Sequence, residues 1–306
     1  MVVYFSAIQV AHLRLRNSGL ANSDPTTKVV QLRSHKFRSH NQSPTNSGLA
    51  IHAQYLSLHI MSHSNEDSPI NKNPERNLVI VVTGASRGIG LQVTAQLLSM
   101  GRNVVAIART QDSLERLGSR YPGRLSIKPT DLSKHNAIGQ LANELLDAGI
   151  SIAGLVNNAG VLVNKPFLES DEGDWDVQLR LNVMAPALLT RALVPMMIRG
   201  AHVLNISSMG GYQGSSKFPG LSAYSASKGA LAILTESLAV ELAGHDIASN
   251  CLCLGAVQTE MLEQAFPGIQ VPVTAEQMGR YIADFVCHGH ELYNGRILPV
   301  ALSDPE

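Results

Sequence analysis

The stretch Leu78–Gly90, which reads LVIVVTGASRGIG, decides the fold of this 306-residue chain. Its first five residues form a continuous apolar run rich in β-branched side chains, as in a strand that is buried on both faces of a sheet. Ile89, Val93 and Leu97 then recur at the spacing of a helix. A strand that passes through a glycine-rich turn into a helix is typical of a nucleotide site, because free amides at the helix N-terminus attract phosphate.

The three glycines of this turn have separate physical roles. Gly84 allows the tight turn after the strand, and Gly88 lets the backbone approach a pyrophosphate without an intruding Cβ atom. The third, Gly90, lets the helix pack closely on the strand. The turn therefore predicts a cofactor-binding site that includes Gly84, Ser86, Arg87, Gly88, Ile89 and Gly90.

Beyond this turn, the chain alternates between apolar runs and segments with helical periodicity. Such alternation predicts an α/β Rossmann fold, a doubly wound, seven-stranded parallel sheet with helices on both faces. Because no Pro-, Gly- or Ser-rich linker divides residues 77–306, we expect them to form a single domain. The expected strands are 78–82, 103–107, 125–128, 151–156, 201–206, 247–254 and 296–300, and the expected helices are 89–100, 111–119, 134–147, 175–198, 222–242 and 275–287.

Two of the predicted helices carry boundary signals. Ser133 precedes the helix at 134–147 and is expected to be its N-cap. Pro186 and Pro195 are expected to bend or end the long helix at 175–198, since proline cannot donate to the helical ladder.

Charge separates the first part of the chain from the rest. The chain has 24 basic and 24 acidic residues, but residues 1–60 carry six basic side chains and one acidic one, so they hold +5 and the rest −5. Residues 1–76 lack a sustained period, and we predict a disordered basic extension. Three interpretations stay open: an organelle transit peptide for a plastid or mitochondrion, a nucleic-acid-binding arm, or translated upstream sequence with the true start near Met61.

The overall composition excludes several classes of protein. A net charge of zero gives no general attraction to nucleic acid or to an anionic membrane, so neither is an expected partner. No apolar run approaches the roughly 20 residues of a membrane-spanning helix. The three cysteines form no disulfide framework and favour a reducing, cytoplasmic location. Cys251 and Cys253 have no ligand-spaced partner, so we expect them in the core, with no metal site.

Further motifs follow in a fixed order along the chain. Together with Thr-Gly-x3-Gly-x-Gly at 83–90, this order resembles the classical short-chain dehydrogenases/reductases over almost all of residues 77–301. The motifs are Asp131 after the third strand, Asn157–Gly160 after the fourth, Asn182 in the long helix, Ser208 after the fifth strand, Tyr224 four residues before Lys228, and Gly255–Thr259.

This resemblance implies an oxidoreductase that transfers a hydride between a nicotinamide cofactor and a carbonyl compound or secondary alcohol. Tyr224 would be the general acid/base, with a pKa lowered by the ammonium of Lys228. Ser208, rather than the adjacent Ser207, would stabilise the substrate oxygen. Asn182 would hold a water molecule in a proton relay. Further cofactor contacts would come from Asp131, Leu132, Asn158, Ala159, Gly160, Val257 and Thr259, besides Tyr224 and Lys228.

The end of the second strand bears on the choice of cofactor. An NAD site usually has an acid there that accepts from the ribose 2′-hydroxyl. This chain has Ala108 followed by Arg109, and a guanidinium would bind the 2′-phosphate of NADP instead. Arg87 offers a second cation. We therefore expect NADP(H) to be preferred, with NAD(H) possible.

The chain departs from the family pattern near the expected substrate. Ser208 and Tyr224 are 16 residues apart, about three more than usual, and the extra residues fall near 214–217. Leu254 stands where the family has proline. Residues 260–274 would form a short, mostly apolar lid, which suits a small or medium carbonyl compound.

Two further expectations concern the protein as a whole. Family members are commonly homodimers or homotetramers. The alternative function is a catalytically weak nucleotide-sensing or scaffold protein that keeps the fold.

Overall fold

A seven-stranded parallel sheet forms the centre of residues 78–302, the part of the chain that this computed structural model describes. The strand order is β3-β2-β1-β4-β5-β6-β7, so the order reverses between β1 and β4, where α/β sheets bind their ligands. The strands are β1 (Leu78–Thr83), β2 (Asn103–Ala108), β3 (Leu125–Pro129), β4 (Ser151–Asn157), β5 (Met197–Ser208), β6 (Ala248–Leu254) and β7 (Ile297–Val300).

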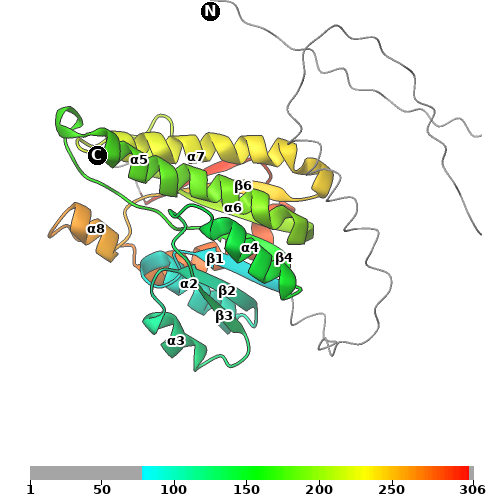
Figure 1. The fold of residues 1–306 in the computed structure, drawn as a ribbon. Coiled ribbons are helices and arrows are strands. Elements are labelled where there is room, and N and C mark those ends of the chain that lie inside the picture. Colours follow the sequence, from blue (N-terminus) through cyan, green and yellow to red (C-terminus); the bar gives the residue numbers. More distant parts are fainter. Residues whose placement is uncertain (1–77, 303–306) are drawn as a thin grey trace, which may run out of the picture. The chain divides into compact units, whose positions relative to one another are not determined.

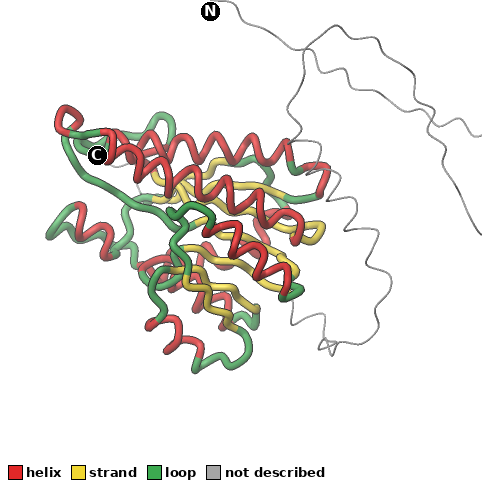
Figure 2. The backbone as a smooth tube through the Cα atoms, in the orientation of Figure 1, coloured by secondary structure: helices red, strands yellow, loops and turns green. Residues whose placement is uncertain are grey.

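Helices cover both faces of this sheet, as Figures 1 and 2 show. On one face, α2, α3 and α9 pack into a shared apolar cluster, and on the other face α4 and α6 pack into a second one. The helices are α2 (Gly88–Ser99), α3 (Asp112–Gly118), α4 (Ala137–Asp147), α5 (Glu172–Leu179), α6 (Ala185–Leu193), α7 (Ser222–Glu241), α8 (Glu260–Ala265) and α9 (Ala275–His288).

The central strand β1 explains why the sheet is buried on both faces. Ile80 and Val82 belong to the cluster under α2 and α9, whereas Val79 and Val81 belong to the cluster under α4 and α6. Successive side chains of a strand point to opposite faces, so a continuous apolar run is needed when both faces are covered. The predicted Rossmann fold with seven parallel strands is confirmed.

The long helix predicted at 175–198 is divided in the structure. A π-helical turn, Arg180–Met184, separates α5 from α6, and a 3-10 turn, Val194–Met196, follows α6. Pro186 lies in the first turn of α6, directly after this π-helical turn. The helix prediction is wrong at its end, because β5 already begins at Met197.

The start of α4 also differs from the prediction. The helix begins at Ala137, and Ser133 is not its cap. The amide and hydroxyl of Ser133 both donate to Asp131 Oδ1, at 3.0 and 2.7 Å. Asn136 precedes the helix in the left-handed conformation, with φ of 65°. A local side-chain hydrogen bond therefore competes successfully with helix capping here.

The predicted basic extension, residues 1–76, lies outside the described residues, as does the proposed start near Met61. Within residues 78–302, no helix combines the length and the apolar character that a crossing of the membrane requires.

Candidate active site

The glycine turn after β1 is crowded at two positions. Gly84 has a φ of +65°, and a Cβ atom there would lie 2.9 Å from the Cα atom of Ala159. At Gly90, a Cβ atom would lie 2.2 Å from the carbonyl oxygen of Gly84 and 2.5 Å from Nδ2 of Asn158. Both contacts are too short for any side chain, so the close approach of helix to turn that the sequence suggests is present.

Thr83 and Asn158 hold this turn against β4. Nδ2 of Asn158 donates to the Thr83 carbonyl at 2.9 Å. Oγ1 of Thr83 accepts from the amides of Asn158 and Ala159 at 3.0 and 2.9 Å. The Asn158 side chain, expected to line the cofactor, thus fixes the backbone of the glycine turn.

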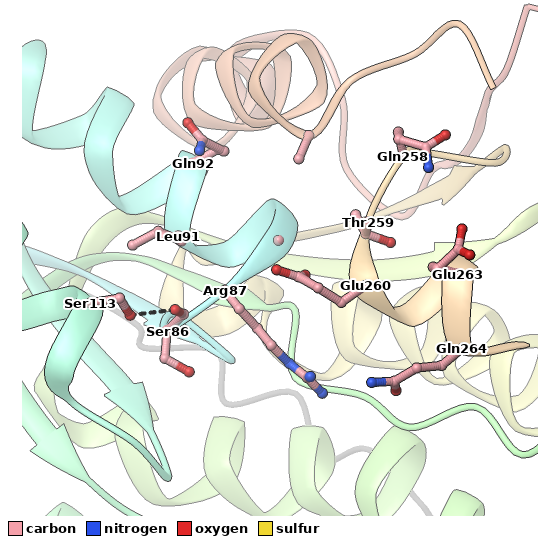
Figure 3. Close-up of a pocket in the computed structure, with 12 residues that line it drawn as sticks. Ser86, Arg87, Leu91, Gln92, Ser113, Gln258, Thr259, Glu260, Glu263 and Gln264 are labelled. Carbon is pink, nitrogen blue, oxygen red and sulfur yellow. Dashed lines mark hydrogen bonds between the residues drawn. The ribbon is translucent and has the colours of Figure 1, made fainter. Parts of the chain in front are cut away.

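A cavity of about 680 Å³ opens beside the N-terminus of α2. Arg87 stands at the N-cap position without a side-chain cap bond, and no acidic residue lies in the first turn of α2. The helix amides therefore have no side-chain acceptor there, which fits the binding of a phosphate group. Figure 3 shows the side chains around this cavity, which is lined by Ser86, Arg87, Gly88, Gln92, Thr259 and Glu260 among others.

Arg109 and Asp131 mark the neighbouring end of the sheet. Arg109 follows the last residue of β2, and Asp131 lies two residues after β3. The pKa of Asp131 lies below its ordinary value, first because the Ser133 hydroxyl donates to it, and also because of the positive charges of Arg109 and Lys134. Leu132, expected at the adenine, is buried in the core cluster beside α4.

Lys228 is buried in α7 and reaches the end of β5. Its Nζ atom donates to the carbonyl of Ile206 at 2.8 Å and lies 5.8 Å from the centre of the Tyr224 ring. A Cβ atom on Gly160 would lie 3.3 Å from Nζ. Burial lowers the pKa of Lys228 to about 8.

Tyr224 lies in the first turn of α7, with Ser208 as its hydrogen-bond partner. Burial raises the pKa of Tyr224 to about 12, and the hydrogen bond with Ser208 only partly opposes this. The direction is opposite to the expected one. The Lys228 ammonium is directed to the Ile206 carbonyl, and the loss of hydration around the phenol decides its pKa.

The two adjacent serines point to opposite sides of β5. Oγ of Ser207 donates to the Lys228 carbonyl at 2.8 Å and is buried against α7. Oγ of Ser208 accepts from the amide of Gly210 at 3.1 Å and faces Tyr224. Because side chains alternate along a strand, only Ser208 reaches the tyrosine.

Asn182 lies in the π-helical turn between α5 and α6. Its side chain exchanges two hydrogen bonds with the backbone of Val161, both at 2.9 Å, and donates to Ser227 Oγ at 2.9 Å. Ser227 in turn donates to the Tyr224 carbonyl at 2.7 Å. The structure therefore connects Asn182 to α7 through Ser227, and π-turns often lie at functional sites.

Sequence reasoning missed a polar network buried beneath these residues. Asn157 donates to Asn205 at 2.8 Å and to Thr190 at 3.3 Å, and Asn205 donates to Thr235 at 2.9 Å. The available signal was an asparagine within the apolar run of a central strand, at position 205. Such buried amides persist because they are hydrogen-bonded.

The segment after β6 closes the site from the other side. Thr259 caps α8 by accepting from the amide of Leu262 at 3.3 Å, and Val257 is buried. Leu254, which replaces the usual proline, extends β6 by pairing with Val300. Cys251 and Cys253 are fully buried in the same strand, as expected for core residues.

Comparison with known proteins gives a consistent result. The family model for short chain dehydrogenases matches residues 78–270. A fatty acyl-CoA reductase from Acinetobacter baylyi is 34% identical over 191 residues, which cover 60% of this chain and 64% of that protein, just under two thirds. The dehydrogenase/reductase SDR family member 4 from Sus scrofa is 35% identical over 198 residues, 61% of this chain and 68% of that protein.

A solved structure extends the comparison to the fold. The short chain dehydrogenase from Burkholderia cenocepacia, in complex with NADP, has a TM-score of 0.66. It covers 75% of this chain and 98% of its own, at 23% sequence identity. At this identity the likeness concerns the fold alone.

Proposed function

The chain belongs to the short-chain dehydrogenase family, a family of oxidoreductases, and from this premise we propose that it reduces carbonyl compounds or oxidises secondary alcohols with NADP(H). The observation that carries the proposal is the assembly of Ser208, Tyr224 and Lys228 at the carboxyl end of β5. Ser208 ends β5, whereas Tyr224 and Lys228 lie in α7. Tyr224 would donate the proton, Ser208 would bind the substrate oxygen, and Lys228 would supply a positive charge.

The cofactor proposal rests on the ends of β1 and β2. The uncapped N-terminus of α2 and the cavity beside it suit the pyrophosphate. Arg109, placed after β2 without an acid at the preceding position, would bind a 2′-phosphate, and Arg87 lies on the adjoining turn. When bound, NADP(H) supplies or accepts the hydride. NAD(H) remains the weaker alternative.

Proton transfer would depend on Tyr224. With a pKa of about 12, its phenol stays protonated at neutral pH and can donate to the oxygen of a carbonyl that is being reduced. Ser208 would hold that oxygen from the other side and stabilise the charge that develops on it. Carbonyl reduction requires a protonated tyrosine, and the raised pKa of Tyr224 favours this state.

Lys228 would keep Tyr224 in place and stabilise the negative charge that forms on its oxygen when the proton leaves. Its ammonium lies over the phenol ring and is fixed by the Ile206 carbonyl. When the proton leaves Tyr224, this nearby positive charge favours the phenolate. Asn182 would act indirectly, through Ser227 and the Tyr224 carbonyl.

We also propose an oligomeric state and a cellular location for the protein. Apolar side chains of α6 and α7 are exposed, among them Met184, just before α6, and Leu188 and Ile233, which suits an interface with a second copy in a dimer or tetramer. All three cysteines are free thiols, which fits a cytoplasmic location.

One experiment tests the catalytic proposal. Purified protein should oxidise NADPH in the presence of members of a panel of ketones and aldehydes. Tyr224→Phe should lower this rate by about 10²- to 10⁴-fold while NADPH still binds. Unchanged turnover in Tyr224→Phe would refute the proposed role. NADPH binding without turnover of any carbonyl by the wild type would favour the scaffold function instead.

A further inference from the structure

Three segments that follow residues of the candidate site contact one another. Residues 161–165 start after Gly160, residues 212–221 connect Ser208 with Tyr224, and residues 260–266 follow Thr259. We call these segments the mouth loops. Each segment follows a residue that we propose to bind the substrate or the cofactor, so we expect the space between them to face Tyr224.

Asn164 connects the mouth loops to one another. Its Nδ2 atom donates to the carbonyl of Ala265, the last residue of α8, at 2.8 Å. Gly220 packs directly on it, since a Cβ atom there would lie 2.0 Å from Asn164 Oδ1, and φ at this glycine is +83°. The amide of Lys165 also donates to the Gly220 carbonyl at 3.0 Å.

Two phenylalanines complete this connection. Phe218 belongs to the loop that is about three residues longer than the family pattern, and Phe266 belongs to the expected lid. Their rings meet edge to face, with centres 6.4 Å apart and an angle of 62°. Phe218 keeps 38% of its surface exposed. The longer loop thus brings an aromatic side chain to the lid, and apolar area remains open beside it.

The two lysines of the mouth loops are already engaged. Nζ of Lys217 donates to the Tyr212 carbonyl and to the carbonyl and hydroxyl of Ser215, at 2.7 to 2.9 Å, which uses its three protons. Lys165 pairs with Asp174 at 2.7 Å and with Asp171 at 3.5 Å. An anionic substrate would have to displace these partners.

The lid also contributes carboxylates rather than cations. Glu260 and Glu263 line the cavity at the N-terminus of α2, together with Arg87. Glu263 accepts from the amide of Gly268 at 3.1 Å, so it is directed along the lid itself. The lid, residues 260–274, contains no lysine or arginine that could bind a substrate carboxylate or phosphate.

We propose that the Phe218–Phe266 pair forms an apolar wall of the substrate site and selects uncharged, apolar carbonyl compounds over carbonyl compounds that carry a carboxylate or phosphate. This inference rests on the proposed carbonyl-reducing function of the same site. It makes Phe218, on the lengthened loop, a specificity-determining residue. Apolar substituents of the substrate would gain contact with both rings, and an anionic group would find both lysines of the mouth loops already paired.

Two probes with the same keto group test this inference, namely ethyl benzoylformate and the benzoylformate anion. Binding of each to the NADPH-loaded Tyr224→Phe protein is measured by calorimetry, and turnover of each is measured with wild type. We expect the ester to bind more tightly and to have the higher kcat/KM. Phe218→Lys should shift the ester-to-anion ratio by about 10- to 100-fold toward the anion, the range for a charge-assisted contact. Phe218→Leu should shift it little.

Tyr293→Lys is the matched control, because Tyr293 is 37% exposed, is also in an aromatic pair and lies before β7 at the opposite end of the sheet. It should leave the ratio unchanged. Equal binding of ester and anion, binding of neither probe, or an equal shift in Tyr293→Lys would overturn the inference. Preferential ester binding without turnover in wild type would instead overturn the proposed function and leave the substrate class supported.

Discussion

The part of the site at the end of β1 and the part at the end of β5 are built from different kinds of groups. At the end of β1, the site is made of backbone: Gly84 and Gly90 leave no space for a side chain, and the amides of α2 face a cavity. At the end of β5, the site is made of buried polar side chains, with Lys228 held by a carbonyl and Asn182 held by Val161 and Ser227.

This difference determines how each side should respond to mutation. The glycine turn after β1 should lose its structure when a side chain is added to Gly84 or Gly90. Neither the turn nor α2 can move without breaking the hydrogen bonds of Thr83 and Asn158. A site of buried side chains fails when a donor is removed, because the remaining partner loses its hydrogen bond out of contact with water.

The largest effect is expected from Gly90→Ala. The added Cβ atom would lie 2.2 Å from the Gly84 carbonyl oxygen, so we expect a loss of about 4 kcal/mol or more in unfolding free energy, together with loss of NADPH binding. Urea denaturation and a cofactor titration measure both. Gly139→Ala is the control, because Gly139 lies in α4 with no atom within 4 Å of the added Cβ, and this change should stabilise the protein by about 0.5–1 kcal/mol. Equal stability of the two variants would contradict the steric account.

The adjacent serines separate chemistry from packing. Ser208→Ala removes the partner of Tyr224 and the proposed contact to the substrate oxygen, so kcat should fall by about 10²- to 10³-fold with little change in stability. Ser207→Ala removes the hydrogen bond to the Lys228 carbonyl and should cost about 1 kcal/mol of stability, with a much smaller loss in kcat. Steady-state kinetics and thermal unfolding on both variants decide this. The opposite pattern would assign the catalytic role to Ser207.

Arg109→Asp tests the cofactor side by charge alone. Loss of the guanidinium and repulsion by the new carboxylate should weaken NADPH relative to NADH by about 10- to 100-fold. The ratio of the two dissociation constants is the measurement. Arg102→Asp is a matched exposed arginine that precedes β2 and should leave the ratio unchanged. If the ratio stays constant in Arg109→Asp, the 2′-phosphate is bound elsewhere.

The smallest expected effect, when counted over a single pH unit, is the pH dependence of carbonyl reduction. Lys228 has a pKa of about 8, so its ammonium is charged below pH 8 and is lost as pH rises above it. Tyr224, with a pKa of about 12, stays protonated throughout this range. We therefore expect kcat/KM to be level below pH 8 and to fall about tenfold for each further pH unit. A profile that stays level to pH 10 would show that Lys228 keeps its charge or does not contribute.

The sequence alone determined those features that depend on the spacing of neighbouring residues. The apolar run of β1, the glycines after it and the alternation of later strands and helices specify a parallel sheet, because each depends on residues within one turn or one strand. The order of the later residues then indicated Ser208, Tyr224 and Lys228. The structure brings these three residues together.

Only the tertiary structure decided how those residues are held. The π-turn at Asn182 is stabilised by Val161 and Ser227, which lie 21 positions before it and 45 positions after it in the chain. The pKa of Tyr224 depends on burial by several elements, and the contact of Phe218 with Phe266 joins two loops 48 residues apart. Such contacts have no local pattern, because they arise from the packing of the helices and loops on the sheet.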